Sequence, residues 1–523
     1  MTKRTLPAPL LKAFITISVM LSTVMQALDT TIANVALPDI KGTMSATQDQ
    51  VAWVLTSYIV AAAIATPLTG FLAARFGRKR LFVLSVAGFT ITSMLCGAAH
   101  SLPELVIFRL LQGIFGASLV PFSQAVLLDT FPPEKHATAM SFWGMGVMIG
   151  PILGPTLGGY LTQVQDWRWV FYINLPFGLL ALAGILFFVP ETEPQRERRF
   201  DLFGFTLLAL AIGLLQMVLD RGQSEDWLSS TEIISYSVIA AVAFYMFVVH
   251  IFTADEPFIE PGMFYNRNFA LGLCFIFVIG IVLLATLALL PPFLQSLMGY
   301  PVLTTGLLLA PRGVGSFISM VIIGRLNNRI DPRILLAVGL SLVALSLYEM
   351  SGFNLYVNHW IVIRSGLTQG LGLGMIIVPL STISFATLAP KYRHEGTAMF
   401  SLMRNIGSSI GISIVMTLLA RNTQRNHSLL GEVLTPFNSN LSSISSLMNP
   451  ETTSGALMLN TELTRQASAM AFISDFQLMT LVTLMVMPLL LLLHDPMAGS
   501  DSAKESVADT DLQELSAEAA ESA

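Results

Sequence analysis

Long apolar segments, separated by short polar connections, recur along nearly the whole chain of 523 residues. A segment of about 20 predominantly apolar residues is long enough to cross a lipid bilayer as an α-helix. The pattern therefore predicts an all-α polytopic membrane protein. The fourteen predicted spans are 12–36, 51–73, 81–99, 104–127, 138–162, 169–189, 202–219, 232–253, 269–290, 303–324, 334–352, 358–380, 396–420 and 472–493.

Two connections are longer or more polar than the others. Residues 190–201 form a charged linker after the sixth span, and residues 421–471 form a segment rich in Ser, Asn and Thr before the last span. Connections this long are uncommon and often carry a function. Residues 421–471 are therefore either an ordinary solvated loop or a surface on which a partner protein docks.

The distribution of Lys and Arg predicts how the chain is oriented. With the N-terminus inside, 18 of the 28 basic residues fall on the cytoplasmic side, six fall outside and four lie within spans. Basic residues are enriched in the cytoplasmic connections of membrane proteins. Both termini are expected in the cytoplasm, and residues 421–471 on the outer side.

Short sequence matches at a nearly constant spacing indicate an internal duplication. Gly70–Arg75 matches Gly324–Arg329 at an offset of 254, and Gln112-Gly113 matches Gln369-Gly370 at an offset of 257. Spans one to six and nine to fourteen are therefore predicted to be two copies of a six-helix unit, arranged as a parallel duplication. The predicted divisions are a first six-helix bundle at 1–189, a linker with two inserted helices at 190–267, a second six-helix bundle at 268–493 and a cytoplasmic tail at 494–523.

Composition agrees with a membrane protein and narrows its chemistry. Hydrophobic residues make up 54% of the chain and charged residues 12%, about half the charged fraction of a typical soluble protein. The net charge of −5 comes from the tail, which holds eight acidic residues and one Lys and is expected to be disordered. The sequence has no phosphate-binding loop, metal-ligand spacing or nucleophile motif. We therefore expect no enzyme, no direct use of ATP and no cofactor.

The fifth predicted span carries glycine at every fourth position, which places these glycines on one face of a helix. Two prolines lie among them, and such a helix would be unstable in water. In a bilayer, small residues allow close helix packing and neighbouring helices satisfy freed backbone groups. The face is either a simple packing surface or one that lets the helix bend and slide. Its residues are Gly146, Gly150, Pro151, Gly154, Pro155, Gly158 and Gly159.

Asp29 and Arg109 are charged residues in the outer halves of spans one and four, so the two could pair. A charge at the bilayer centre costs about 2.5–3.5 kcal/mol on insertion scales. Burial favours a neutral carboxylic acid, whereas a paired arginine favours the charged form. We predict that Asp29 and Arg109 couple the binding of a proton to a change in helix packing, and a static ion pair is the alternative. The neighbouring Thr31 and Asn34 are expected to join helices.

Three further arginines, Arg312, Arg364 and Arg404, fall within predicted spans. Each is expected to pair with an acid near a helix end, such as Glu349 or Asp220, or to reach lipid phosphate. If these arginines faced the cavity instead, they would favour anionic or amphiphilic substrates such as fatty acids.

The connection between the second and third spans holds glycines and basic side chains. Anchoring on the cytoplasmic side is sufficient to explain the basic residues, and a contact between the two halves of the protein is the alternative. The residues of this loop motif are Gly70, Arg75, Gly77, Arg78 and Lys79.

Five segments, taken in order, resemble motifs of the fourteen-helix drug:proton antiporter family of the major facilitator superfamily, and within it the EmrB/QacA-like exporters. In the loop motif, Ala74 stands where that family has an acidic residue, which argues against a latch through that carboxylate. The segments are Leu28–Pro38, Gly70–Arg80, Arg109–Gly113, Gly150–Gly159 and Asp166–Pro176.

The resemblance implies a multi-pass protein of the bacterial inner membrane that uses the proton gradient to export amphiphilic drugs and toxic compounds. The long outer segment is similar to that of the EmrB-type subgroup, whose members work with a periplasmic adaptor and an outer-membrane channel. The expected partners are therefore these two proteins, protons, lipid and small amphiphilic substrates, and not nucleic acid. The residues that bind substrate are not indicated.

Two other functions remain open. The first is a dedicated exporter of a fatty acid, a siderophore or another metabolite, which would share the same motifs. The second is a membrane sensor or scaffold without transport activity, which would bind a partner through residues 421–471. The glycine face and the charges inside the spans argue against the second.

Overall fold

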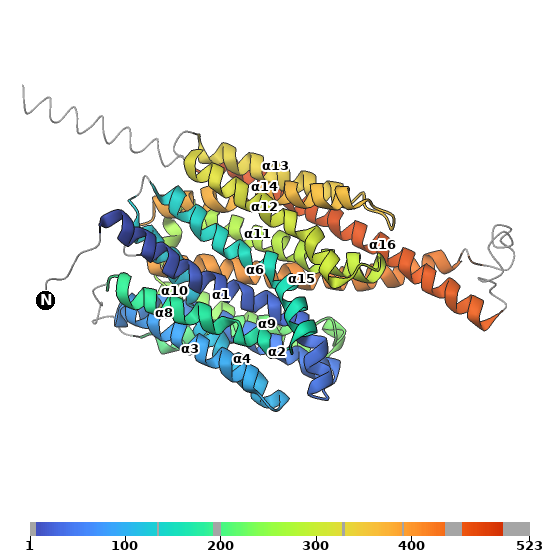
Figure 1. Ribbon diagram of the computed structural model, residues 1–523. Coiled ribbons are helices and arrows are strands. Elements are labelled where there is room, and N and C mark those ends of the chain that lie inside the picture. Colours follow the sequence, from blue (N-terminus) through green and yellow to red (C-terminus); the bar gives the residue numbers. More distant parts are fainter. Residues whose placement is uncertain are drawn as a thin grey trace, which may run out of the picture.

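The computed structural model describes residues 7–132, 135–191, 200–326, 330–389, 392–432, 434 and 452–494. These residues contain helices and no β-strand. The long helices run side by side in one bundle (Figure 1). They are α1 (Ala8–Thr43), α2 (Gln48–Phe76), α3 (Arg78–Ala98), α4 (Leu102–Gly116), α5 (Leu119–Thr130), α6 (His136–Val164), α7 (Trp169–Tyr172), α8 (Asn174–Phe188), α9 (Leu202–Arg221), α10 (Thr231–Thr253), α11 (Arg267–Pro292), α12 (Val302–Leu326), α13 (Pro332–Met350), α14 (His359–Ala386), α15 (Arg393–Glu432) and α16 (Thr453–Val486).

Thirteen segments of the described chain are helices long and apolar enough to cross a membrane, which agrees with the predicted polytopic class. The predicted fifth span is α6, a helix of 29 residues. The predicted fourth span is interrupted, because α4 ends at Gly116 and α5 begins at Leu119. Pro121 lacks the N–H that would continue the helical ladder across this point. The predicted tail after His494 lies outside the described residues.

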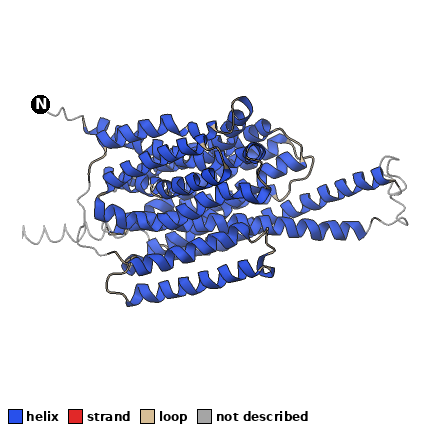
Figure 2. Cartoon of the chain, turned by 90° about the horizontal axis from the view of Figure 1, so that it is seen from below, coloured by secondary structure: helices blue, strands red, loops and turns tan. Residues whose placement is uncertain are grey.

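The last two helices extend well beyond the rest of the bundle (Figure 2). Helix α15 has 40 residues and is therefore about 60 Å long, roughly twice the thickness of a bilayer core. The Asn426 side chain donates to the Ala467 carbonyl at 3.2 Å, and His427 Nε2 lies 2.9 Å from Asn460 Oδ1. Residues 421–432 and 453–471 therefore form a helical hairpin, and the prediction of a solvated loop is wrong for them. Residues 435–451 lie outside the described part.

Helix α6 lies at the centre of the bundle, between α1 and α12. Against α12, Thr138 Oγ1 donates to the Gly324 carbonyl at 3.0 Å, and a Cβ added to Gly306 would collide with Thr156. Helix α2 packs against α15 in the same way, with Gly70 beside the Glu395 backbone. Helices of the first predicted six-helix unit therefore contact helices of the second at two places.

Helices α9 and α10, predicted as an insertion, pack on each other, and α9 contacts both α2 and α15. Ser413 Oγ of α15 donates to the Leu219 carbonyl of α9 at 2.8 Å. Asp201 caps α9 by accepting hydrogen bonds from the Gly204 and Phe258 backbones at 2.8 and 3.0 Å. Its carboxylate also pairs with His250 at 2.8 Å. Burial raises the pKa of Asp201, but these hydrogen bonds outweigh it and hold the pKa below its usual value.

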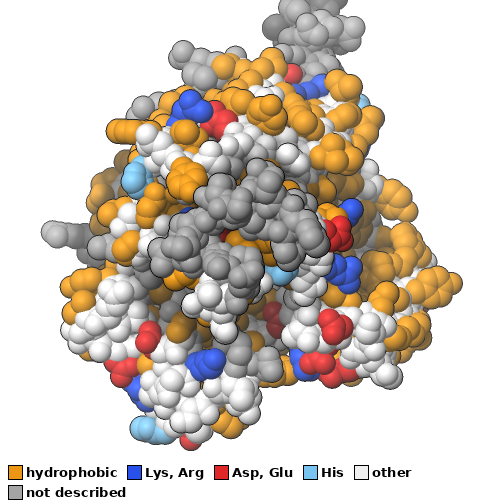
Figure 3. All heavy atoms as spheres, turned by 90° about the vertical axis from the view of Figure 1, so that its right-hand side faces the viewer, with side chains coloured by type: hydrophobic (Ala, Val, Ile, Leu, Met, Phe, Trp, Pro, Cys, Tyr) orange, Lys and Arg blue, Asp and Glu red, His pale blue; other side chains and the backbone are white. Residues whose placement is uncertain are grey.

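The outer surface of the bundle is apolar, as a surface in contact with lipid must be. Large hydrophobic side chains such as Phe187, Tyr245 and Phe252 are more than two-thirds exposed. The end that carries the helical hairpin shows charged side chains across its face and hydrophobic ones around its rim (Figure 3). This distribution agrees with a chain that spans a membrane.

Candidate functional site

The glycine face of α6 packs directly against α1. Cβ atoms added at Gly146, Gly150 and Gly154 would overlap with Met20, Ala27 and Thr31, respectively. Thr31 Oγ1 also donates to the Gly150 carbonyl at 3.0 Å. Because α1 and α6 approach this closely, any side chain larger than hydrogen would push them apart.

The rest of this motif follows the same arrangement where it is described. Gly158 lies against Ile32 and Val35 of α1, and Gly159 is buried. The backbone of α6 is helical through Pro151 and Pro155, whose side chains lie outside the described part. The predicted packing face is therefore observed, and its partner belongs to the same six-helix unit. The opposite face of α6 contacts α12 of the other unit.

Asp29 of α1 and Arg109 of α4 form a buried ion pair. Arg109 Nη1 donates to Asp29 Oδ2 at 2.7 Å, and the side chains are 1% and 0% exposed. The sequence placed these residues at similar depth, and the structure brings them together. The remaining carboxylate oxygen, Oδ1, accepts from Gln112 Nε2 at 2.8 Å and from Asn174 Nδ2 at 2.9 Å.

The Arg109 side chain is held from several other directions. Its Nε donates to the Val54 carbonyl at 3.1 Å, and its Nη1 also donates to Gln112 Oε1 at 2.8 Å. The guanidinium lies over the Tyr58 ring, with 4.3 Å from its carbon to the ring centroid. Phe171 lies on it as well, at 5.6 Å. These contacts fix the cation where the carboxylate can reach it.

The geometry suits a carboxylate that is charged in this conformation. Its three side-chain partners all donate hydrogen bonds to it, and an ionised carboxylate is an acceptor only. A buried pair of this kind is stable as a unit, but removing one partner leaves an uncompensated charge and costs about 3–5 kcal/mol. Neutralising Asp29 by a proton has the same electrostatic effect as removing its charge. Protonation of Asp29 would therefore weaken its contact with Arg109.

Sequence reasoning missed part of this cluster. Asn174 lies in a motif used for the family resemblance, and Gln112 lies in the repeat, but neither was identified as a partner of Asp29. A polar amide inside an apolar span is the signal that could have found both. The prediction for Asn34 was wrong, because its side chain is exposed and donates only to Thr30 of its own helix, at 3.4 Å. Asn34 points away from the helices that pack against α1.

Asp475 is a second buried acid that the sequence analysis overlooked. It lies in α16 and is 1% exposed. Neither of its carboxylate oxygens has a hydrogen-bond partner among the described residues. A charged carboxylate in such surroundings is costly, so we expect Asp475 to be neutral in this conformation.

Arg78 of the loop motif is buried, although anchoring alone would leave it exposed. Arg78 is 2% exposed and its Nη1 pairs with Asp129, while Arg393 Nη1 lies 3.1 Å from the other Asp129 oxygen. Arg393 belongs to α15, so these three residues join the two six-helix units at one end of the bundle. Gly77 adopts φ +90°, which allows the sharp turn from α2 to α3.

The other basic residues of the loop motif stay near the surface. Arg75 lies over the neighbouring Phe76 ring, 5.9 Å from its centroid, and Lys79 is partly exposed. These positions agree with anchoring at the membrane surface.

The three arginines predicted to pair with helix-end acids differ in outcome. Arg364 pairs with Glu349 at 3.2 Å, as predicted. Within the described part of the chain, neither Arg312 nor Arg404 forms an ion pair with Glu349 or Asp220. For these two, contact with lipid phosphate stays a prediction. Asp220 accepts instead from Thr56 Oγ1. Arg312 lies in an apolar cavity.

The fold and the buried ion pair define a polytopic helical membrane protein with charges held inside its bundle. The family model described as Major Facilitator Superfamily matches residues 19–412, more than half of the chain. The chain therefore belongs to the major facilitator superfamily and is a member of a family of transporters.

The chain is also similar to individual proteins that have been described. The Escherichia coli (strain K12) "Multidrug export protein EmrB" is 38% identical over 431 residues, which cover 81% of this chain and 83% of that protein. The Neisseria gonorrhoeae "Fatty acid resistance protein FarB" is 37% identical over 430 residues, or 82% and 85% of the two chains. The solved structure of the proton:xylose symporter XylE shares the fold, with a TM-score of 0.59 at 14% identity over 91% of this chain and 95% of that one.

Proposed function

We propose that the protein is an antiporter that exports amphiphilic drugs and other toxic compounds across the inner membrane of a bacterium in exchange for protons. The observation that carries the proposal is the buried Asp29–Arg109 pair, with Gln112 and Asn174 as further donors to the same carboxylate. The export of drugs is proposed from the likeness to EmrB. The driving force is the proton gradient, with no cofactor.

In the proposed cycle, a proton arriving from the outer side neutralises Asp29. The neutral acid loses its attraction for Arg109, and α1 and α4 separate slightly at this point. Because the glycine face couples α1 tightly to α6, the movement reaches the α6–α12 contact between the two units. The ion cluster of Arg78, Asp129 and Arg393 breaks as the cytoplasmic end opens. Asp29 then releases its proton to the cytoplasm, and substrate binding closes this end again.

The topology belongs to the same proposal. Both termini and the Arg78 cluster lie in the cytoplasm, and the helical hairpin of α15 and α16 points into the periplasm. The basic residues of the loop motif support this orientation. The two predicted six-helix units act as the moving halves, and α9 and α10 lie outside them.

The hairpin is proposed to dock a periplasmic adaptor, which in turn connects to an outer-membrane channel. Support comes from the length of α15, which carries the hairpin well beyond a bilayer. Exposed apolar side chains on the hairpin, such as Leu429 and Leu457 at 52% and 67% exposure, suit a helical partner. Deleting residues 425–468 should abolish the drug resistance of whole cells but preserve transport by the purified protein. Loss of both activities would contradict the docking role.

Export of a fatty acid or another dedicated substrate is the second candidate. FarB, a relative of similar identity, is named for fatty acid resistance, and an unpaired buried arginine favours an anionic substrate. A sensor without transport activity is disfavoured, because such a protein needs no proton-dependent pair inside the membrane. Flux through reconstituted protein separates transport from sensing.

Drug uptake into liposomes tests the proposal. Purified protein is reconstituted into liposomes with an acidic interior, and uptake of ethidium and of decanoate is followed against protein-free liposomes. Wild-type protein should accumulate at least one of these amphiphiles as long as the pH gradient lasts. Asp29→Asn should lose gradient-driven uptake, whereas the control Asp39→Asn, an exposed acid of the same helix, should retain it. Uptake by Asp29→Asn at the wild-type rate would remove Asp29 from the mechanism.

A further inference from the structure

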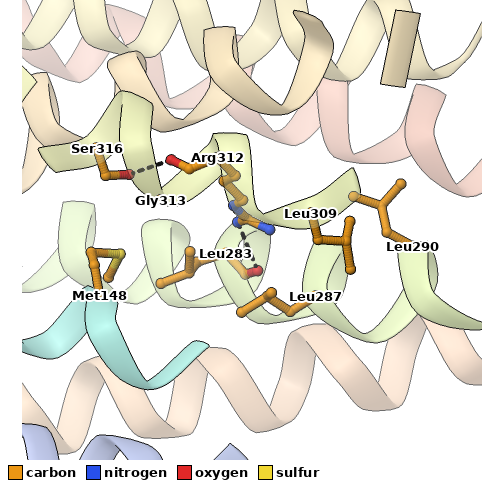
Figure 4. A pocket seen from close by; sticks show the side chains of 8 residues that line it. All are labelled: Met148, Leu283, Leu287, Leu290, Leu309, Arg312, Gly313 and Ser316. Carbon is orange, nitrogen blue, oxygen red and sulfur yellow. Dashed lines mark hydrogen bonds between the residues drawn. The ribbon is translucent and has the colours of Figure 1, made fainter. Parts of the chain in front are cut away.

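A cavity in the middle of the protein places one arginine among apolar side chains. Helix α12 contributes Leu309, Arg312, Gly313 and Ser316, α11 contributes three leucines, and α6 of the other unit contributes Met148 (Figure 4). The space among these side chains, counted together with the open solvent at its mouth, is about 400 Å³. The cavity is therefore shared by the two units.

Among the described residues that line this cavity, Arg312 is the one with a charged side chain, and its charge is not balanced. The residue is 7% exposed, and Nη2 donates to the Leu283 carbonyl at 3.3 Å. Nη1 is buried without a hydrogen-bond partner, and no carboxylate among the described residues lies within ion-pair distance of the guanidinium. An isolated buried cation is costly. An anion that enters the cavity would pair with the Arg312 guanidinium and balance its charge.

The duplication explains why the counter-ion is missing. Arg109, three residues before Gln112, corresponds to Gly366, three residues before Gln369, and Thr286 is matched to Asp29 by its contact with that glutamine. Gln369 Nε2 donates to Thr286 Oγ1 at 3.4 Å, just as Gln112 donates to Asp29. The second unit thus keeps the glutamine and the helix contact but has lost both the acid and its arginine.

In the second unit the buried cation is Arg312, which lies at a different helix position from Arg109. At the offset of 254 residues, Arg312 corresponds to Tyr58, whose ring covers the Arg109 guanidinium in the first unit. Gly366, at the position of Arg109, lies beside the Arg312 backbone and leaves room for its side chain. Gln369 Oε1 has no hydrogen-bond partner in the described part of the chain, whereas Gln112 Oε1 accepts from Arg109. The second unit therefore resembles the first with its carboxylate removed.

We propose that this cavity binds the anionic head of an amphiphilic substrate, with the substrate's carboxylate taking the place that Asp29 has in the first unit. Arg312 Nη1 holds the head, and the apolar tail lies along Leu283, Leu287, Leu290 and Leu309. This inference rests on the proposed export of amphiphiles, and it adds that the exported amphiphiles carry a negative charge. Amphiphilic carboxylates are preferred, and amphiphilic cations of the same length are repelled.

Direct binding tests this inference separately from transport. Decanoate, methyl decanoate and decyltrimethylammonium have matched chains and differ in head charge, and their affinity for purified protein is measured by calorimetry. Wild-type protein should prefer decanoate. Arg312→Gln should weaken decanoate binding by about tenfold or more, because a hydrogen-bonded charge pair contributes about 1.5–3 kcal/mol, and should leave methyl decanoate unchanged. Arg312→Lys should retain part of the preference.

The controls distinguish the possible failures. Arg364→Gln removes an exposed arginine that pairs with Glu349 and should bind all three ligands as wild type does. Arg312→Gln removes an unbalanced charge, so its thermal midpoint should equal or exceed that of wild type. Equal decanoate affinity in wild type and Arg312→Gln, or no decanoate binding by wild type, would overturn the inference. Proton-driven uptake of ethidium by Arg312→Gln would then show that the proposed function still holds.

Discussion

Arg109 Nη1 lies 2.7 Å from Asp29 Oδ2, and both side chains are completely enclosed by the first six-helix unit. In water such a pair would contribute little, but here each charge has no other means of neutralisation. The relationship makes the packing of α1 against α4 depend on the charge of one carboxylate. In the proposed antiporter, this relationship is what couples transport to protons.

Removing both charges should be less harmful than removing one. Asp29→Asn and Arg109→Gln each leave a buried charge without its partner, so each should destabilise the protein by about 3–5 kcal/mol. The double variant buries no charge and should have a higher thermal midpoint than either single variant. Thermal unfolding in detergent measures all three. Additive losses in the double variant would show that the two side chains do not act as a pair.

The double variant also separates stability from function. Because it lacks the proton-accepting group, it should remain unable to use a pH gradient even when its stability is recovered. Gradient-driven uptake by a stable double variant would contradict the coupling role.

Adding one methyl group to the glycine face should disrupt the α1–α6 contact. The Cβ of Gly150→Ala would collide with the Ala27 backbone, and overpacking of this kind costs about 1–3 kcal/mol or more. We therefore expect a lower thermal midpoint and slower transport. Gly42→Ala, in α1 with nothing within 4 Å of the new Cβ, is the matched control and should not destabilise. Equal midpoints for the two variants would mean that the close approach is not needed.

Asp129→Asn should favour opening of the cytoplasmic end, because Asp129 joins Arg78 of the first unit to Arg393 of the second. Asp129 is about a third exposed, so its pairs contribute about 1 kcal/mol, which corresponds to a roughly fivefold change in population. Thiol labelling of Ser141→Cys, buried beside Gly324, reports the opening once the exposed Cys274 is replaced by serine.

A control for this experiment is Glu191→Gln, which removes an exposed partner of Arg80. Its labelling rate should match that of the parent protein. If Asp129→Asn labels no faster than Glu191→Gln, the ion cluster does not hold the two units together.

Asp201 should make stability depend on pH only in the acid range. Its pKa is lower in the folded protein than its ordinary value of 3.8, so the unfolded chain takes up the proton first. Its stabilising contribution is therefore complete above that value and is lost as the pH falls through the folded pKa. The difference in thermal midpoint between wild type and Asp201→Asn should be constant from pH 7 to about 5 and shrink below 3.8. A difference that grows on acidification would contradict this assignment.

The sequence predicted the features that follow from hydropathy and from helix geometry. Apolar runs located the spans, the four-residue spacing gave the glycine face, and depth in the membrane suggested that Asp29 and Arg109 pair. The helical hairpin was missed, because Arg421–Glu432 continues α15 through polar residues that carry no apolar periodicity. A helix that extends into water beside one partner needs only a narrow contact.

Partners that come from distant helices could not be predicted. Asn174 reaches Asp29 because α8 packs against α1, and Asp129 meets Arg393 across 264 residues of sequence. Arg312 has no acid beside it among the described residues, and the second unit has Thr286 where the first has Asp29. Such facts depend on which helix faces lie opposite each other, which a single sequence does not specify.

The most direct test of the central claim is whether a substrate gradient moves protons through Asp29. Liposomes that contain the protein, a trapped pH-sensitive dye and no initial pH gradient receive an inward gradient of an amphiphile that wild type transports. The account predicts that protons leave the liposomes as the amphiphile enters, and that Asp29→Asn abolishes this proton movement while Asp39→Asn does not. Proton movement in Asp29→Asn at the wild-type rate would contradict it.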